Sequence, residues 1–222
     1  MKTNSKLIIF DMDGTLIDSG NVITNTINFV RSNFGLEKLS KETMLLALND
    51  PAINGAEFFY GTDKFTDKQR ELFGQYYDKH CISDIVLYDG IEVLLQTLKS
   101  NYQLSVATNA SSIYANKMLD FLGIKDYFSI IVGADMVEHP KPKGDMLKFS
   151  CDKLQILKEN SIMVGDSKKD LNAAKDFGIR CVLVNWGFSE HQENEGTNIV
   201  HDVVGLINEI DANSHNKCNF ST

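Results

Sequence analysis

Residues 7–15 read Leu7-Ile8-Ile9-Phe10-Asp11-Met12-Asp13-Gly14-Thr15. The short apolar run at the start, rich in β-branched and aromatic side chains, predicts a strand covered on both faces. Ligands of open α/β sheets bind beyond the carboxyl ends of the strands, and this strand ends directly before Asp11. We therefore expect Asp11 and Asp13 to lie at the position of the active site in such sheets. An ordinary acidic turn, built from the same residue types, is the alternative interpretation.

Helical and strand patterns alternate in the second half of the sequence. Strands are predicted at residues 103–107, 129–132, 161–164 and 181–184, and helices at residues 91–99, 112–122, 145–157 and 168–177. Such alternation is typical of right-handed βαβ crossovers and a parallel sheet. Residues 7–10 are expected to join this sheet. The predicted fold class is α/β, with a Rossmann-like parallel sheet and helices on both of its faces.

The region between residues 20 and 85 shows only helical patterns. Helices are predicted near residues 22–30, 43–48 and 66–77, with loops near residues 49–55 and 61–63. We therefore expect an all-α cap domain at 20–85, inserted into an α/β core domain made of residues 1–19 and 86–210. Residues 211–222 are polar and lack periodicity, which predicts a frayed tail.

Composition restricts the class of protein. The chain has 222 residues, of which 43% are hydrophobic and 23% charged, as is usual for soluble globular proteins. No apolar stretch approaches the roughly 20 residues that cross a membrane, and the run before Asp11 is too short for a signal peptide. The net charge of −8 argues against nucleic-acid binding, which needs clustered Lys and Arg. We expect a cytoplasmic monomer or small homo-oligomer that binds neither nucleic acid nor membranes.

The four cysteines are far apart and form no Cys-x-x-Cys pair with metal or redox spacing. We expect them to be reduced and mostly buried thiols, as is usual in a cytoplasm.

Two carboxylates separated by one residue suit the hydrolysis of a phosphate ester. Residues i and i+2 of an extended segment point to the same side. Asp11 is able to attack phosphorus and form an acyl phosphate, which splits one difficult displacement into two easier ones, provided that a cation offsets the repulsion between the anions. Asp13, with its pKa raised by anionic neighbours, is suited to protonate the leaving oxygen and later to deprotonate water. Gly14 permits a sharp turn, and Thr15 is expected to orient that turn through its hydroxyl.

Polar groups suited to phosphate and metal follow three further predicted strands. Thr108 and Asn109 offer a hydroxyl and a main-chain amide to phosphate oxygens, although a helix cap would use the same residues. Lys141 lies between two prolines that stiffen its main chain, so its ammonium is suited to face phosphate; a surface lysine is the alternative. Asp166 ends a strand and Asp170 follows one helical turn later. Carboxylates suit Mg²⁺, and Asp170 is alternatively an acid at a helix N-terminus.

These four segments resemble, in order, the four motifs of the haloacid dehalogenase-like phosphohydrolase superfamily. The resemblance implies that Asp11 is the nucleophile, that Asp13 is the general acid and base, and that the main-chain carbonyl of Asp13 helps to hold Mg²⁺. It also implies that Thr108 and Asn109 bind phosphate and that Lys141 acts in the third motif. Gly144 departs from that motif, in which a second proline is common. The metal site is predicted to comprise Asp11, Asp13, Asp166 and Asp170.

The helical insertion resembles the cap of the phosphoglycolate phosphatase and β-phosphoglucomutase-like group. The resemblance implies a phosphatase acting on a small phosphorylated metabolite, an acid or a sugar, because true dehalogenases lack the acid that Asp13 supplies. Substrate choice is expected in the cap loop that contains Asn49, Asp50, Asn54 and Gly55, although these residues are equally suited to an ordinary turn. A phosphomutase and a non-catalytic binding module remain as alternatives.

Overall fold

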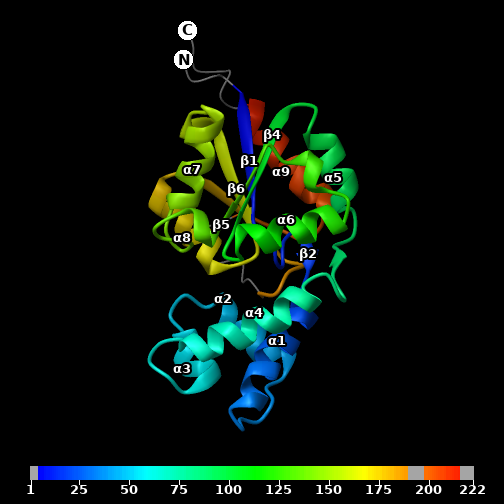
Figure 1. Ribbon diagram of the computed structural model, residues 1–222. Helices are drawn as coiled ribbons and strands as arrows, with labels where there is room; N and C mark the ends of the chain where they lie inside the picture. The colour runs from blue at the N-terminus through cyan, green and yellow to red at the C-terminus, as the bar shows by residue number, and fades with distance from the viewer. Residues whose placement is uncertain (1–4, 190–197, 216–222) are drawn as a thin grey trace.

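A six-stranded parallel sheet forms the centre of the computed structural model, which describes residues 5–189 and 198–215 (Figure 1). The strand order is β5-β4-β1-β6-β7-β8. The bounds of these strands are β1 Lys6–Phe10, β4 Tyr102–Thr108, β5 Ile130–Gly133, β6 Ser161–Gly165, β7 Arg180–Val184 and β8 Asn198–Val200. The predicted α/β fold with a parallel sheet is confirmed.

Helices cover both faces of the sheet because the strands are apolar on both sides. In β1, Ile8 and Phe10 pack into one core cluster, whereas Leu7 and Ile9 pack into the other. The first cluster receives helices α5 (Ile91–Leu98), α6 (Ser112–Phe121) and α9 (Val203–His215), and the second receives α7 (Asp145–Leu154) and α8 (Lys168–Phe177). This double coverage explains why the sequence of β1 reads as one continuous apolar run.

The remaining helices form a separate group beyond the end of the sheet at which β1 ends (Figure 1). They are α1 (Gly20–Asn33), α2 (Lys41–Asn49), α3 (Gly55–Tyr60) and α4 (Asp67–His80). We call α1–α4 the helical unit. It has its own core cluster, in which Ile27 and Val30 of α1 meet Met44 of α2 and Leu72 of α4. The carboxyl ends of the strands therefore face a second packed body across the site described below.

Two short strands connect the helical unit to the sheet. Strand β2 (Ile17–Asp18) leads into α1, and β3 (Val86–Leu87) follows α4. They pair antiparallel, with Ile17 opposite Leu87 and Asp18 opposite Val86. Sequence patterns did not predict this pair because two residues are too few to show an alternation. The chain thus enters and leaves the helical unit at adjacent points.

Further elements differ from the sequence prediction. Helix α3 lies between the two predicted loops, where no element was predicted, and β8 and α9 follow the last predicted strand. The predicted tail at 211–222 is wrong at its start, because α9 continues to His215. Its apolar residues Leu206 and Ile210 are buried in the core, which holds the helix against the sheet. Short 3-10 helices at Lys125–Tyr127, Ala134–Met136 and Lys158–Asn160 complete the elements of the described chain.

Within the described residues, no helix has both the length and the apolar composition that a membrane span requires. Cys81, Cys151 and Cys181 are buried, as the sequence predicts, and Cys218 lies outside the described residues.

The start of α6 depends on a carboxylate from the adjacent strand end. Asp135, which follows β5, accepts hydrogen bonds from the Ser112 amide at 2.6 Å and from the Ser112 hydroxyl at 2.8 Å. Partial burial raises the pKa of Asp135, but these two hydrogen bonds outweigh it and the pKa lies below its usual value. The charged form of this side chain is therefore stabilised by folding.

We expect Asp135→Ala to lower the free energy of unfolding by about 1 kcal/mol at pH 7, since two hydrogen bonds to a helix N-terminus are lost. Because the pKa is lowered in the folded state, this contribution is complete above the unfolded pKa and is lost as pH falls through the folded pKa. Urea unfolding of both proteins at pH 7 and at about pH 3.5 measures the difference. A deficit that stays constant between these pH values would contradict the role of the charge.

Candidate active site

Asp11 and Lys141 form the centre of the site. Asp11 directly follows β1, and its amide donates to the Val164 carbonyl at 2.8 Å, which extends the pairing with β6. The Lys141 Nζ atom lies 2.6 Å from Asp11 Oδ1 and 2.6 Å from Asp170 Oδ1. Both carboxylates and the ammonium are buried. The lysine that the sequence singled out in its Pro-flanked loop thus bridges two carboxylates, and its own peptide bond to Pro142 is cis.

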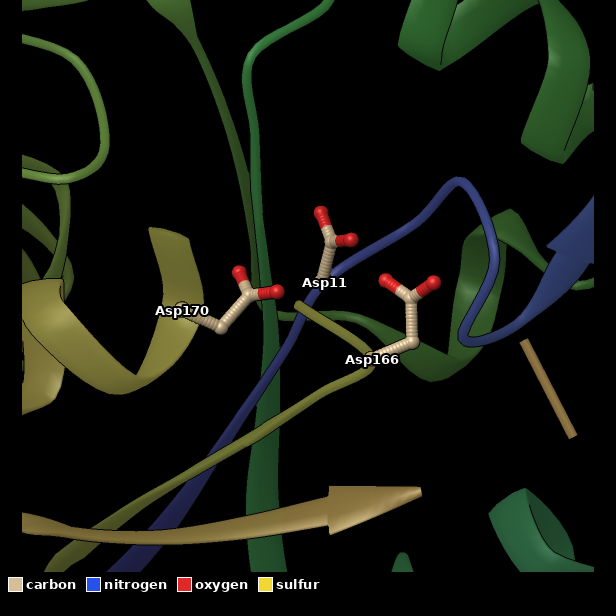
Figure 2. A group of neighbouring side chains, drawn as sticks. All are labelled: Asp11, Asp166 and Asp170. Carbon is tan, nitrogen blue, oxygen red and sulfur yellow. The ribbon is translucent and has the colours of Figure 1, made fainter. Parts of the chain in front are cut away.

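Three carboxylates converge at this point. Oxygen atoms of Asp11, Asp166 and Asp170 lie within 4.8 Å of one another (Figure 2). They come from the end of β1, the end of β6 and the first turn of α8. Three buried oxygen donors so close together are chemically suited to a hard divalent cation such as Mg²⁺. Asp13 is not a member of this carboxylate cluster.

Glycines allow the backbone to approach these carboxylates closely. Gly14 has a φ of +84°, and a Cβ atom at this position would lie 2.3 Å from Asp166 Oδ2. A Cβ atom at Gly165 would lie 2.4 Å from Asp170 Cγ, and one at Gly187 would lie 2.2 Å from the Gly14 carbonyl oxygen. Any side chain at these three positions would displace the cluster or the loops around it.

The electrostatics of the cluster follow from burial and from like charges. The pKa of Asp11 is raised to about 7, and burial is the largest cause. The charge of Asp170 raises this pKa further, whereas Lys141 lowers it. Burial, followed by the charges of Asp11 and Asp170, likewise raises the pKa of Asp166 well above its usual value. The Asp11 and Asp170 carboxylates in turn raise the pKa of Lys141 despite its burial. The ammonium therefore stays charged, whereas the shifts at Asp11 and Asp166 favour the protonated forms of these carboxyl groups.

Asp13 follows β1 two residues after Asp11, lines the same cavity and is half-buried. Its carboxylate accepts hydrogen bonds from the hydroxyl of Ser19 and, at 3.5 Å, from that of Thr108. Its pKa is raised, mainly because burial disfavours the charged form, whereas Ser19, Lys141 and Thr108 lower it. The predicted direction of the shift is thus found, but the predicted cause, anionic neighbours, is not the main one. A raised pKa keeps a proton available on Asp13.

Asn109, which directly follows β4, supports the main chain of Lys141. Thr108 accepts a hydrogen bond from the Ala110 amide at 3.0 Å, and Asn109 donates its side-chain amide to the Lys141 carbonyl at 2.8 Å. Both residues line the same cavity as Asp11. The Asn109 side chain therefore fixes the loop that carries the ammonium, a contact that sequence spacing does not reveal.

Asp170 combines the two interpretations that the sequence left open. Its Oδ2 atom accepts hydrogen bonds from the amide and the hydroxyl of Ser167, at 3.1 and 2.6 Å, and thereby completes a capping box at the start of α8. Its Oδ1 atom accepts from Lys141. The residue thus caps a helix and holds the lysine at the same time.

Asn49 is the residue of the predicted cap loop that reaches the site. Its side-chain amide, at the end of α2, donates to Asp166 Oδ2 at 3.3 Å and to the Ser189 hydroxyl at 3.1 Å. Asp50 instead accepts from the Ala52 amide, and Asn54 caps α3, whose first residue is Gly55. These last three residues do not line the cavity.

Thr15 is buried and is not among the residues that line the cavity. Its hydroxyl has no hydrogen-bond partner within the described part of the chain, whereas its carbonyl accepts from the Trp186 indole at 3.0 Å. The orienting contact at this turn is therefore made by the main chain.

The segment after β7 also contributes to the site, although sequence analysis assigned it no role. The Phe188 amide donates to Asp166 Oδ2 at 2.7 Å, and the Phe188 residue lines the cavity. Lys169 of α8 donates to the Leu48 carbonyl of α2. The residues after β7, Trp186, Gly187 and Phe188, carry no charge and match no motif. Only the position of β7 in the sheet could have indicated that this segment contributes to the site.

A cavity of about 340 Å³ lies between the carboxyl ends of the strands and the helical unit. Asp11, Asp13 and Lys141 line it from the sheet side. Side chains of the helical unit form the opposite wall, namely Ile23, Ile27, Leu48, Asn49, Phe73 and Tyr77. The reactive groups therefore share one cavity.

This parallel sheet, with ionisable groups buried at the carboxyl ends of its strands, defines an α/β protein with an ionic site at the edge of the sheet. The chain belongs to the haloacid dehalogenase-like hydrolase family, whose model matches residues 8–184. The resemblance identified from the four motifs is therefore confirmed, as is the prediction of an enzyme of the hydrolase class.

Curated relatives and solved structures agree with this assignment. The chain is 30% identical over 193 residues to a phosphoglycolate phosphatase of Chromobacterium violaceum, covering 83% of this chain and 87% of that protein. It is 29% identical to the phosphoglycolate phosphatase of Aquifex aeolicus, with 82% and 86% covered. The structure of a predicted phosphatase from Clostridium acetobutylicum superimposes with a TM-score of 0.84 at 25% identity, covering 95% of this chain and 100% of that chain.

We expect Lys141→Met to lower the free energy of unfolding by about 3–5 kcal/mol, because removing one partner of a buried ion pair leaves the other uncompensated. Lys143→Met, in the same loop, is the matched control: its side chain is exposed and pairs with Asp176 at 3.5 Å, so the change should stay within about 0.5 kcal/mol. Urea unfolding at pH 7 measures both. Equal effects of the two substitutions would contradict the central role of Lys141.

Proposed function

We propose that the protein is a Mg²⁺-dependent phosphatase that hydrolyses a small phosphate monoester through a phosphoaspartyl intermediate on Asp11. The observation that carries the proposal is that Asp11, Asp13 and Lys141 line one cavity, with the ammonium 2.6 Å from the Asp11 carboxylate. The phosphatase names of the relatives support it. Phosphoglycolate and sugar phosphates are the substrate classes to test first.

In the first step, a carboxylate oxygen of Asp11 attacks phosphorus, and the bond from phosphorus to the alcohol oxygen breaks. The Lys141 ammonium lowers the repulsion between the two anions. Asp13, whose pKa is raised, gives its proton to the leaving oxygen. The products of this step are the free alcohol and an aspartyl phosphate.

In the second step, water attacks the phosphorus of the aspartyl phosphate. Asp13, now ionised, takes a proton from this water, and the bond from phosphorus to the Asp11 oxygen breaks. Phosphate leaves and Asp11 is restored. Ser19 and Thr108, which donate to the Asp13 carboxylate, hold it in place for both proton transfers.

A metal ion would be held by the carboxylates of Asp11 and Asp166, with Asp170 close to both. We also propose that Asp13 binds the metal ion through its main-chain carbonyl oxygen. Bound Mg²⁺ supplies positive charge that offsets the negative charge of substrate and nucleophile.

We propose further that the helical unit, residues 20–85, acts as a cap over the core formed by 1–19 and 86–210. Asn49 and Lys169 connect the end of α2 to the core across the cavity mouth. A closed cap excludes water from the reacting groups and contacts the leaving group. The burial of Cys81, Cys151 and Cys181 agrees with reduced thiols in a cytoplasm as the compartment.

We expect Asp11→Asn to lower kcat for Mg²⁺-dependent release of phosphate by at least about 10³-fold, because a neutral amide at this position cannot attack phosphorus to form the acyl phosphate. Asp18→Asn is the control, since Asp18 does not line the cavity. Asp13→Asn should lose about 10²–10⁴-fold on alkyl phosphates but less in the first turnover of 4-nitrophenyl phosphate, whose leaving group needs no proton.

Initial rates and rapid-quench bursts on a panel of phosphate esters measure these effects. Unchanged activity of Asp11→Asn would rule out the covalent mechanism. Conversion of a sugar phosphate to its isomer would favour the mutase, and inactivity on every ester would favour a binding module.

Metal binding has a readout that does not depend on activity. We expect Mg²⁺ in excess to raise the melting temperature of EDTA-treated protein by several degrees, since a ligand at 100 times its Kd stabilises by about 2.7 kcal/mol. Asp166→Asn should remove most of this shift, whereas Asp120→Asn, an exposed acid paired with Lys125, should keep it. Differential scanning fluorimetry measures all three proteins. A shift of equal size in Asp166→Asn would exclude that carboxylate as a ligand.

A further inference from the structure

The wall of the cavity that faces away from Asp11 is apolar. Ile23 and Ile27 of α1, Leu48 of α2 and Phe73 of α4 line it from the helical unit, and Phe188 lines it from the core. The bound phosphate group must lie against Asp11, so the alcohol portion of the substrate must lie against this wall. The wall therefore decides which alcohols fit.

Aromatic rings form a continuous part of this wall. Phe73 and Tyr77 stack with ring centroids 5.3 Å apart and an interplanar angle of 22°. Tyr114 of α6 meets Tyr77 edge to face, with centroids 4.9 Å apart and an angle of 84°. All three residues line the cavity. Tyr77 donates its hydroxyl to the Met118 sulfur, so this polar atom is directed into the core.

Two lysines supply the positive charge of the cavity. Among the described residues that line it, only Lys141 and Lys169 are cationic. Lys141 is bound to Asp11 and Asp170, and Lys169 donates to the Leu48 carbonyl. Asn49, Ser111 and Tyr114, which also line the cavity, are polar but neutral. Among the described residues, a second negative charge buried against this wall would find its cationic partner only in Lys169, where it would compete with the Leu48 carbonyl, and such burial is unfavourable.

We propose that the site selects phosphate monoesters whose alcohol is uncharged and carries an aromatic or similarly apolar ring, and that it discriminates against alcohols that carry a carboxylate. The inference rests on the phosphatase function proposed above and departs from the substrate in the names of the curated relatives. Recognition comes from ring contacts with Phe73, Tyr77 and Tyr114. A cavity of about 340 Å³ has room for a single ring beside a phosphate group, and glycolate would leave most of the apolar wall uncovered.

Two matched substrate pairs test the preference with the full chain and Mg²⁺. Ethyl phosphate and phosphoglycolate differ by one carboxylate, as do benzyl phosphate and 4-carboxybenzyl phosphate. We expect kcat/KM to be about tenfold or more higher for benzyl phosphate than for ethyl phosphate, and to fall at least about tenfold in each pair when the carboxylate is present. A tenfold preference for phosphoglycolate over ethyl phosphate would overturn the inference while leaving a phosphatase. Failure of all four esters to exceed the Asp11→Asn background would overturn the phosphatase proposal itself.

A positive charge introduced into the apolar wall tests its role in substrate choice. We expect Ile23→Lys to raise kcat/KM for 4-carboxybenzyl phosphate and to lower it for benzyl phosphate, so that their ratio changes by about 10²-fold. Val93→Lys, on the exposed face of α5, is the control and should leave the ratio unchanged. Phe73→Leu should raise KM for benzyl phosphate several-fold more than for ethyl phosphate. Thermal unfolding verifies that each variant is folded, and an unchanged substrate ratio in both folded wall variants would overturn the inference.

Discussion

The Lys141 ammonium, placed between the carboxylates of Asp11 and Asp170, is the interaction on which the rest of the site depends. Two distances of 2.6 Å join three buried charges that come from β1, from the loop after β5 and from α8. Removing such charges from water is expensive unless they are paired. The pairing therefore determines how the loop before α7 and the start of α8 are held against β1. Asn109 strengthens the arrangement because it binds the main chain of the same lysine.

The sheet provides this arrangement through its strand order. Strand β1 lies between β4 and β6, so the residues after these three neighbouring strands meet at one edge. The close approach of Gly14 and Gly187 to Asp166 then closes the space around the carboxylates. Burial at this edge raises the pKa of both Asp11 and Asp13, and the surrounding hydrogen bonds and Lys141 partly offset it. The packing that forms this edge of the sheet thus also sets the pKa of the two aspartates.

The sequence predicted the parts of the fold that have strong periodicity. The alternating strands and helices after residue 88 agree with the structure within a few residues, and helix α8 agrees at both ends. The patterns missed β2 and β3 because these strands are too short. They also missed α9, although Leu206 and Ile210 stand four residues apart and are both buried. For the site, spacing identified the residues at the ends of β1, β4 and β6. It did not reveal that Asn109 supports Lys141, or that Phe188 reaches Asp166, because main-chain contacts leave no residue pattern.

The pairing of β2 with β3 has a consequence for the architecture of the chain. Ile17 lies opposite Leu87, so the ends of the intervening segment are already joined before any of its helices is considered. The entropy of closing a loop grows only slowly with its length, and a segment with adjacent ends is readily exchanged for another. The register of the sheet is therefore independent of the size and content of this segment. The short pair of β2 and β3 therefore allows the helical unit to be exchanged for another segment. The geometry of Asp11, Asp166 and Asp170 at the edge of the sheet is kept.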